Sequence, residues 1–190
     1  LYLADHLGIL VWEEMPSNYE FCREGMAALL HEYGEVIERD YNHPCIIGWS
    51  AGNEIGRLSD NPDIAGYLAS AFRHIRSLDS TRLAVYVTHT AAKQYDEPVL
   101  LSDMILFNQY GAHGERADEV HRRYPGKPIF YSEYGSKANN EDPNNRLSDY
   151  AAMVASMRGR EHLIGASVWT FNDYRTNYRD SGTAATGNRP

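Results

Sequence analysis

Two kinds of pattern alternate along the chain: short continuous apolar runs, and longer stretches whose apolar positions recur about every 3.6 residues. The short runs have the length and composition of strands that are buried on both faces of a sheet. We predict six strands from them, at residues 9–12, 45–50, 83–87, 103–107, 129–131 and 163–169.

Helical patterns fill most of the intervals between these runs. Residues 1–7 have the pattern of the last turns of an amphipathic helix, and Gly8 is a typical C-terminal stop. The stretch 88–101 is less regular. Strands that alternate with helices predict a parallel sheet covered by helices. Further helices are predicted at about 21–37, 62–78, 115–124 and 147–157.

Two architectures fit this order, a (β/α)8 barrel (TIM barrel) and an open doubly wound sheet. The Gly-x-Gly-x-x-Gly sequence of dinucleotide-binding open sheets does not follow the first run. A complete barrel takes about 250 residues, so six of its eight units take about 190, and the chain has 190. We therefore expect one α/β domain over residues 1–190, a truncated TIM barrel without its first two units.

Both ends of the chain have the character of a segment from a longer protein. No Met precedes Leu1, and residues 181–190 are rich in Gly, Thr and Asn with no predicted element after them. The first residues lack the charged region, apolar core and cleavage site of a signal peptide.

Composition and charge exclude several classes of function. The net charge is −8, from 18 basic and 26 acidic side chains, which argues against a nucleic-acid partner or a basic membrane-binding surface. No apolar run approaches the roughly 20 residues of a membrane span. Cys22 and Cys45 are too few for a disulfide framework and lack the spacing of a zinc site. We expect a soluble protein, and the compartment, whether cytoplasmic, periplasmic or secreted, stays open.

Polar side chains follow each predicted strand. In parallel barrels the reactive side chains project from the carboxyl ends of the strands, so these residues should meet at one rim. They are Glu13, Glu14, Asn53, Glu54, Thr88, His89, Asn108, Tyr110, Glu133, Tyr134, Trp169, Asn172 and Asp173.

Glu54 and Glu133 are the main candidates for chemistry. Each directly follows an apolar run, and they belong to different strands that face one cleft. Two carboxyl groups on opposite sides of a sugar are the machinery of glycoside hydrolysis. Burial keeps one of them protonated, while hydrogen bonds keep the other ionised. The alternative is structural: each Glu caps a helix or pairs with an Arg.

Four segments resemble glycoside hydrolase family 2, which includes β-galactosidases, β-glucuronidases and β-mannosidases. Residues 40–54 (DYNHPCIIGWSAGNE) are similar to its acid/base signature, and residues 128–135 (PIFYSEYG) to its nucleophile segment. Residues 4–16 resemble its third barrel strand, and residues 169–174 its eighth. The resemblance implies a TIM barrel that here covers strands 3 to 8, with N-terminal β-sandwich domains and the first two barrel units absent.

The resemblance also implies roles. Glu54 would be the general acid/base, and Glu133 the nucleophile of a reaction that retains the anomeric configuration. Asn53 would bind the sugar 2-hydroxyl, Tyr110 would donate a hydrogen bond to Glu133, and Trp169 would form the floor of the sugar site.

Three further residues are weaker candidates for substrate binding: Glu14, His89 and Asn108. Asn108, like Asn172, has loop ordering as its alternative role. His43 precedes a proline at the opposite end of its strand, so we interpret it as structural.

The chain departs from the family pattern at several positions. Tyr41 stands where a basic residue is frequent, and Gly48 where a larger apolar residue is usual. The Asn-x-Lys motif with which the glucuronidase branch binds the sugar carboxylate is not matched by Asn188-Arg189-Pro190. This favours a neutral glycone, galactose first.

The expected function is therefore that of a retaining exo-β-glycosidase, β-galactosidase-like, acting on an oligosaccharide, polysaccharide or glycoconjugate. The resemblance implies no cofactor and no catalytic metal, and leaves open a structural or activating cation and a homo-oligomer of the parent protein. A β-glucuronidase, a β-mannosidase and a non-catalytic carbohydrate-binding barrel are the alternatives. A metallohydrolase is disfavoured because the eight His are scattered without a His-Glu-x-x-His motif.

Overall fold

The structure is a computed structural model that describes residues 1–15, 25–55, 63–93, 98–135 and 143–171, without the side chains of 143–148. The strands are β1 (Val11–Glu14), β2 (Ile46–Asn53), β3 (Leu83–Thr88), β4 (Ile105–Asn108), β5 (Ile129–Tyr134) and β6 (Leu163–Val168). The helices are α1 (Tyr2–Leu7), α2 (Met26–Asp40), α3 (Asp63–Leu78), α4 (Pro98–Leu101), α5 (His113–Arg123) and α6 (Pro143–Met157).

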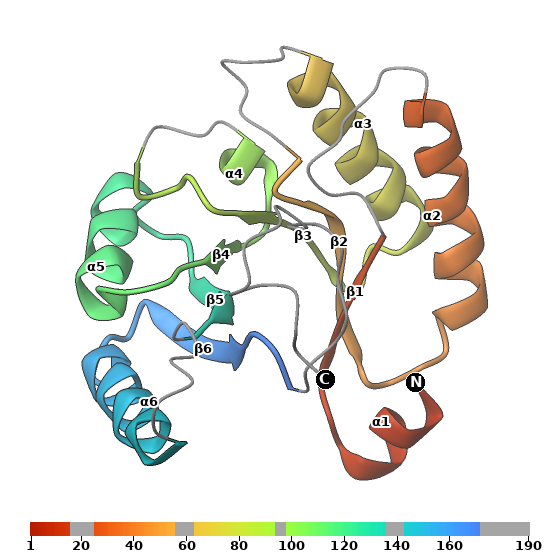
Figure 1. Cartoon of the computed structure of the whole chain (residues 1–190). Coiled ribbons are helices and arrows are strands. Elements are labelled where there is room, and N and C mark those ends of the chain that lie inside the picture. Colours follow the sequence, from red (N-terminus) through yellow and green to blue (C-terminus); the bar gives the residue numbers. More distant parts are fainter. Residues whose placement is uncertain (16–24, 56–62, 94–97, 136–142, 172–190) are drawn as a thin grey trace, which may run out of the picture.

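The six strands form one parallel sheet in the order β1-β2-β3-β4-β5-β6. The sheet curls, and α2, α3, α5 and α6 lie on its outer side (Figure 1). An open doubly wound sheet reverses its strand order at a switch point, whereas each strand here pairs with its successor. The predicted fold, six units of a TIM barrel, is confirmed.

The central strands alternate their side chains between two apolar layers. On β3, Ala84 and Tyr86 pack in the core under the helices, whereas Val85 and Val87 pack with Leu106 in a separate cluster. Because both faces are buried, the sequence of such a strand is continuously apolar rather than alternating. This is the physical basis of the runs from which the strands were predicted.

The two outer strands differ from the prediction of burial on both faces. β1 begins at Val11 rather than residue 9, because the N–H of Ile9 bonds back to the Ala4 carbonyl around the end of α1. Leu10 is 67% exposed and Ile164, on β6, is 58% exposed. Among the described residues, each of these strands pairs with one neighbour only, and apolar side chains just before β1 and on β6 stay exposed.

Packing explains why Gly48 can replace a larger residue. A Cβ at this position would overlap the Trp12 ring and lie 2.9 Å from the Leu83 carbonyl oxygen. The indole of the neighbouring strand therefore occupies the space that a larger side chain would need.

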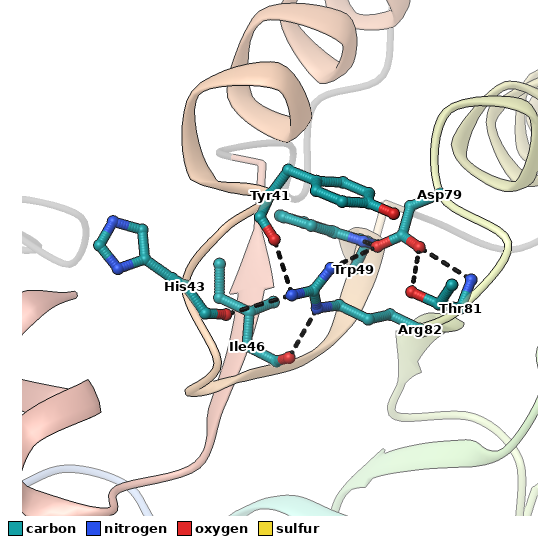
Figure 2. A network of polar contacts seen from close by, with 7 residues as sticks. All are labelled: Tyr41, His43, Ile46, Trp49, Asp79, Thr81 and Arg82. Atoms are coloured by element: carbon teal, nitrogen blue, oxygen red, sulfur yellow. Dashed lines mark hydrogen bonds and ion pairs between the residues drawn. The ribbon is translucent and has the colours of Figure 1, made fainter.

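A buried polar network holds the start of β2 against the turn before β3 (Figure 2). Asp79 accepts hydrogen bonds from Trp49 Nε1 at 2.9 Å and Arg82 Nη1 at 2.8 Å. Arg82 also donates to the carbonyl oxygens of Ile46 and Tyr41, at 2.8 and 2.7 Å. Burial alone would raise the pKa of Asp79, but these hydrogen bonds and those from Thr81 outweigh it and lower the pKa.

In the part of the chain that the structure describes, no helix has the length and apolar character needed to cross a bilayer.

Candidate active site

Glu54 lies where β2 ends, in an unusual backbone conformation. Its φ is 51°, a left-handed value that residues with a Cβ rarely adopt and that costs about 1–3 kcal/mol. The pairing of β2 with β3 shifts register between Ser50 and Asn53, and the Glu54 N–H donates to the Val87 carbonyl at 3.1 Å. Such strain is concentrated at functional sites.

The Glu54 side chain is held by residues from two other strands. Asn108 Nδ2, at the end of β4, donates to Glu54 Oε1 at 2.7 Å. His89 Nδ1, just after β3, lies 3.5 Å from Oε2. In the described residues, its partners are thus an amide and an imidazole rather than an Arg, which disfavours the structural alternative.

Glu133 lies on β5, and its Cα pairs with that of Asn108. The Tyr110 hydroxyl donates to its Oε2 at 2.6 Å, which is the contact expected from the sequence. Burial raises the pKa of Glu133. Hydrogen bonds from Tyr110 and Asn108 oppose this shift, and the charge of Glu54 adds to it, so the two carboxyl groups are electrostatic neighbours.

A third carboxyl group, that of Glu14, approaches the same rim from β1. Ser50 Oγ donates to its Oε2 at 2.7 Å. The residue is exposed, yet the protein atoms around its carboxyl group displace enough water to raise its pKa to about 7. The Ser50 hydrogen bond reduces this shift, and the charges of Glu133 and Glu54 increase it.

Most of the candidate residues thus converge at the carboxyl ends of the strands. Asn53 is included, because its Oδ1 accepts from Asn108 Nδ2 at 3.0 Å. Trp169 lies just past β6 and is 48% exposed. Its backbone N–H donates to the Tyr134 carbonyl. Asn172, Asp173 and residues 188–190 lie outside the described residues.

Two serines were missed by the sequence interpretation. Ser50 binds Glu14, and Ser132 Oγ donates to Asn108 Oδ1 at 2.7 Å. A polar side chain within an apolar run, close to a candidate Glu, was the available signal for both.

Asp5, His43 and Cys45 are the group of potential metal ligands found among the described residues. They lie at the opposite end of β2 from Glu54. Asp5 contacts His43 Nδ1 at 2.5 Å and accepts from the Cys45 backbone N–H at 2.9 Å. Hydrogen bonds, first from Cys45 and then from His43, lower the pKa of Asp5 to about 2. These contacts hold α1 against the start of β2. They are consistent with a structural role for His43.

Comparisons with known proteins were made for the whole chain. The sequence profile described as "Glycosyl hydrolases family 2, TIM barrel domain" matches residues 5–187. The β-glucuronidase of Rattus norvegicus is 28% identical and that of Homo sapiens 26% identical, each over 100% of this chain and 33% of the relative. The chain spans about a third of the length of these curated relatives.

Solved structures share the fold. A GH2 β-galacturonidase from Eisenbergiella tayi, bound to galacturonate, superposes with a TM-score of 0.82 at 22% identity, over 97% of this chain and 37% of that one. A β-glucuronidase from an uncultured Clostridium sp. gives 0.80 at 25% identity, over 98% and 37%. Three of these four proteins are named as β-glucuronidases and one as a β-galacturonidase, and none of the four is named as a galactosidase.

Proposed function

Because the chain belongs to glycoside hydrolase family 2, as part of its TIM barrel domain, we propose that it carries the catalytic residues of a retaining exo-β-glycosidase. Glu54 is the general acid/base and Glu133 the nucleophile. The observation that carries the proposal is the pair of carboxyl groups from β2 and β5, one bound by Asn108 and the other by Tyr110, at one rim of the barrel.

The reaction proceeds in two steps. Glu133 attacks the anomeric carbon while Glu54 donates a proton to the glycosidic oxygen, so the bond to the leaving group breaks and a glycosyl ester forms. Glu54, now ionised, takes a proton from water as the water attacks the same carbon and releases Glu133. Two inversions give net retention, and the two carboxyl groups should lie about 5–5.5 Å apart.

The other candidates have proposed roles around the sugar. Asn53 binds the 2-hydroxyl, Trp169 packs on an apolar sugar face, and Glu14 and His89 bind hydroxyl groups. A Glu14 pKa of about 7 supports this for Glu14, because a carboxyl group near its pKa can both donate and accept hydrogen bonds.

For the glycone, two observations point in different directions. The similarity to β-glucuronidases and a β-galacturonidase favours a β-uronide. Asn188-Arg189-Pro190, without the Lys of the Asn-x-Lys glucuronidase motif, favours a neutral β-galactoside. We place the β-glucuronide first, because the similarity covers the whole chain whereas the motif is three residues long, and the β-galactoside second.

We further propose that β1 to β6 are strands 3 to 8 of an eight-stranded barrel in a longer protein. The exposure of Leu10, just before β1, and of Ile164, on β6, supports this, since the barrel would close over both edges.

The test is mechanism-based labelling of the intact protein with 2-deoxy-2-fluoro glycosyl fluorides of glucuronic acid, galactose, mannose and glucose. We expect the glucuronyl reagent to label Glu133, mapped by mass spectrometry of peptides, and Glu133→Gln to prevent labelling. A label on another residue would refute the nucleophile assignment. Binding without labelling or turnover would support a carbohydrate-binding barrel instead.

A further inference from the structure

The amide of Asn108 is a buried junction between the candidate catalytic residues. The residue is 4% exposed. Its Nδ2 donates to Asn53 Oδ1 at 3.0 Å and to Glu54 Oε1 at 2.7 Å, and its Oδ1 accepts from Ser132 Oγ at 2.7 Å. One side chain therefore connects the ends of β2, β4 and β5.

The contact with Glu54 Oε1 matters for the proton that Glu54 must transfer. A carboxyl oxygen that accepts a hydrogen bond is the less favourable one to protonate, because a proton there would face the donor. Asn108 lies 2.7 Å from Oε1, whereas His89 Nδ1 lies 3.5 Å from Oε2, beyond the usual length of a hydrogen bond. The acidic proton is therefore held on Oε2, the other oxygen.

Glu54 cannot maintain this arrangement by itself. In the proposed reaction it alternates between a carboxylate, which only accepts, and a protonated carboxyl group, which also donates. In the protonated state, a flipped Asn108 amide could present Oδ1 and capture the proton. The hydrogen bond from Ser132 to Oδ1 opposes this flip, because it keeps the amide oxygen turned toward β5.

We propose that Ser132 and Asn108 form a positioning relay, in which Ser132 fixes the Asn108 amide and Asn108 keeps the transferable proton on Oε2 of Glu54. This inference rests on the proposed function. Neither residue reacts with the sugar. Ser132 acts through Asn108, and Asn108 acts on Glu54 and, by a second hydrogen bond, on Glu133.

The relay predicts a dependence on the leaving group. Protonation matters for a glycoside whose aglycone is a poor leaving group and hardly matters for a 2,4-dinitrophenyl glycoside, because dinitrophenolate leaves without a proton. General acid catalysis contributes about 10²- to 10⁴-fold. We expect Ser132→Ala to lower kcat/KM for a methyl or phenyl glycoside by about 10- to 100-fold, and to leave that for the dinitrophenyl glycoside within about 3-fold.

Three variants of the intact protein serve as controls. Ser132→Thr keeps the hydroxyl and should restore the rate with the poor leaving group. Ser156→Ala removes a hydroxyl whose partner, among the described residues, is the Met153 carbonyl of its own helix, and should change neither rate. Asn108→Asp removes the donor and adds a negative charge beside Glu54 and Glu133, so it should slow both substrates, and the one with the poor leaving group more. Thermal melts identify any variant that fails to fold.

The outcomes separate the relay from the proposed function. If the wild type turns over glycosides and is labelled on Glu133, but Ser132→Ala slows both substrates equally or neither, the relay is wrong and the function stands. If the folded wild type neither hydrolyses nor reacts with any reagent of the panel, the proposed function fails and the relay fails with it. The relay is established if Ser132→Ala slows only the glycoside with the poor leaving group and Ser132→Thr restores that rate.

Discussion

At the scale of single residues, the surroundings of each carboxyl group set its behaviour. Glu14, Glu54 and Glu133 have the same chemistry but different partners: a serine, an amide with an imidazole, and a tyrosine. Burial and neighbouring carboxylate charges raise the pKa of Glu14 and of Glu133, and the hydrogen bonds from Ser50 and Tyr110 oppose these shifts.

Glu14 should make the stability depend on pH. Its pKa is about 7 in the folded protein and 4.5 ordinarily, so between these values the folded state binds more protons than the unfolded state. The free energy of unfolding should therefore fall as the pH rises from about 4.5 through 7. Glu14→Gln should melt at a higher temperature than the wild type at pH 8, and the difference should disappear near pH 4.5.

Calorimetry at both pH values tests this. Glu38→Gln, on the exposed side of α2, is the matched control and should give the same difference at both. A Glu14→Gln effect that is independent of pH would contradict the prediction.

Gly48 should tolerate no side chain. In Gly48→Ala, the new methyl group would overlap the Trp12 ring and approach the Leu83 carbonyl, so a strand or the indole must move. We expect a loss of about 1–3 kcal/mol in the free energy of unfolding, measured by urea denaturation. Gly66→Ala, where nothing lies within 4 Å, should be neutral or stabilising, as for helical positions.

At the scale of elements, a network distant from the site fixes the strand that carries Glu54. Asp79 and Arg82 join the α3–β3 turn to the start of β2 (Figure 2). The Asp79 side chain is fully buried, and a buried charge whose partner is removed is strongly destabilising.

Arg82→Met should therefore lower the free energy of unfolding by about 3–5 kcal/mol. Asp79→Asn in the same chain removes the buried charge that Arg82→Met leaves unpaired. The double variant should therefore lose less free energy of unfolding than the sum of the two single losses. Denaturation of all four proteins in a double-mutant cycle measures this coupling. Strictly additive losses would show that the pair is not coupled.

At the scale of the whole molecule, the sheet that the described residues form has two edge strands, β1 and β6. Exposed strand edges with apolar side chains pair readily with other chains, and Ile164 on β6 is 58% exposed.

Residues 1–190 expressed alone should therefore be inactive and associate with rising concentration. Ile164→Lys should reduce this association, measured by light scattering. In the intact protein the same substitution should lower the melting temperature, if barrel strands cover β6 as proposed. If the segment is instead monomeric and unfolds cooperatively, this would count against association through the edges of β1 and β6. It would also count against the proposal that two further barrel units complete the sheet.

The amino-acid sequence by itself determined the order of strands and helices, because burial on both faces produces continuous apolar runs in any parallel sheet. The C-terminal stop at Gly8 and the placement of Glu54 and Glu133 at the carboxyl ends of strands were equally local properties. For the same reason, the rim and most of its candidate residues could be predicted without coordinates.

Only the tertiary structure decided where β1 begins, which strands are edges, and which polar atoms meet. The Ser132–Asn108–Glu54 contacts and the raised pKa of Glu14 depend on register shifts between neighbouring strands and on distances through space. Residues far apart in the sequence create these properties together, so no local pattern of the sequence contains them.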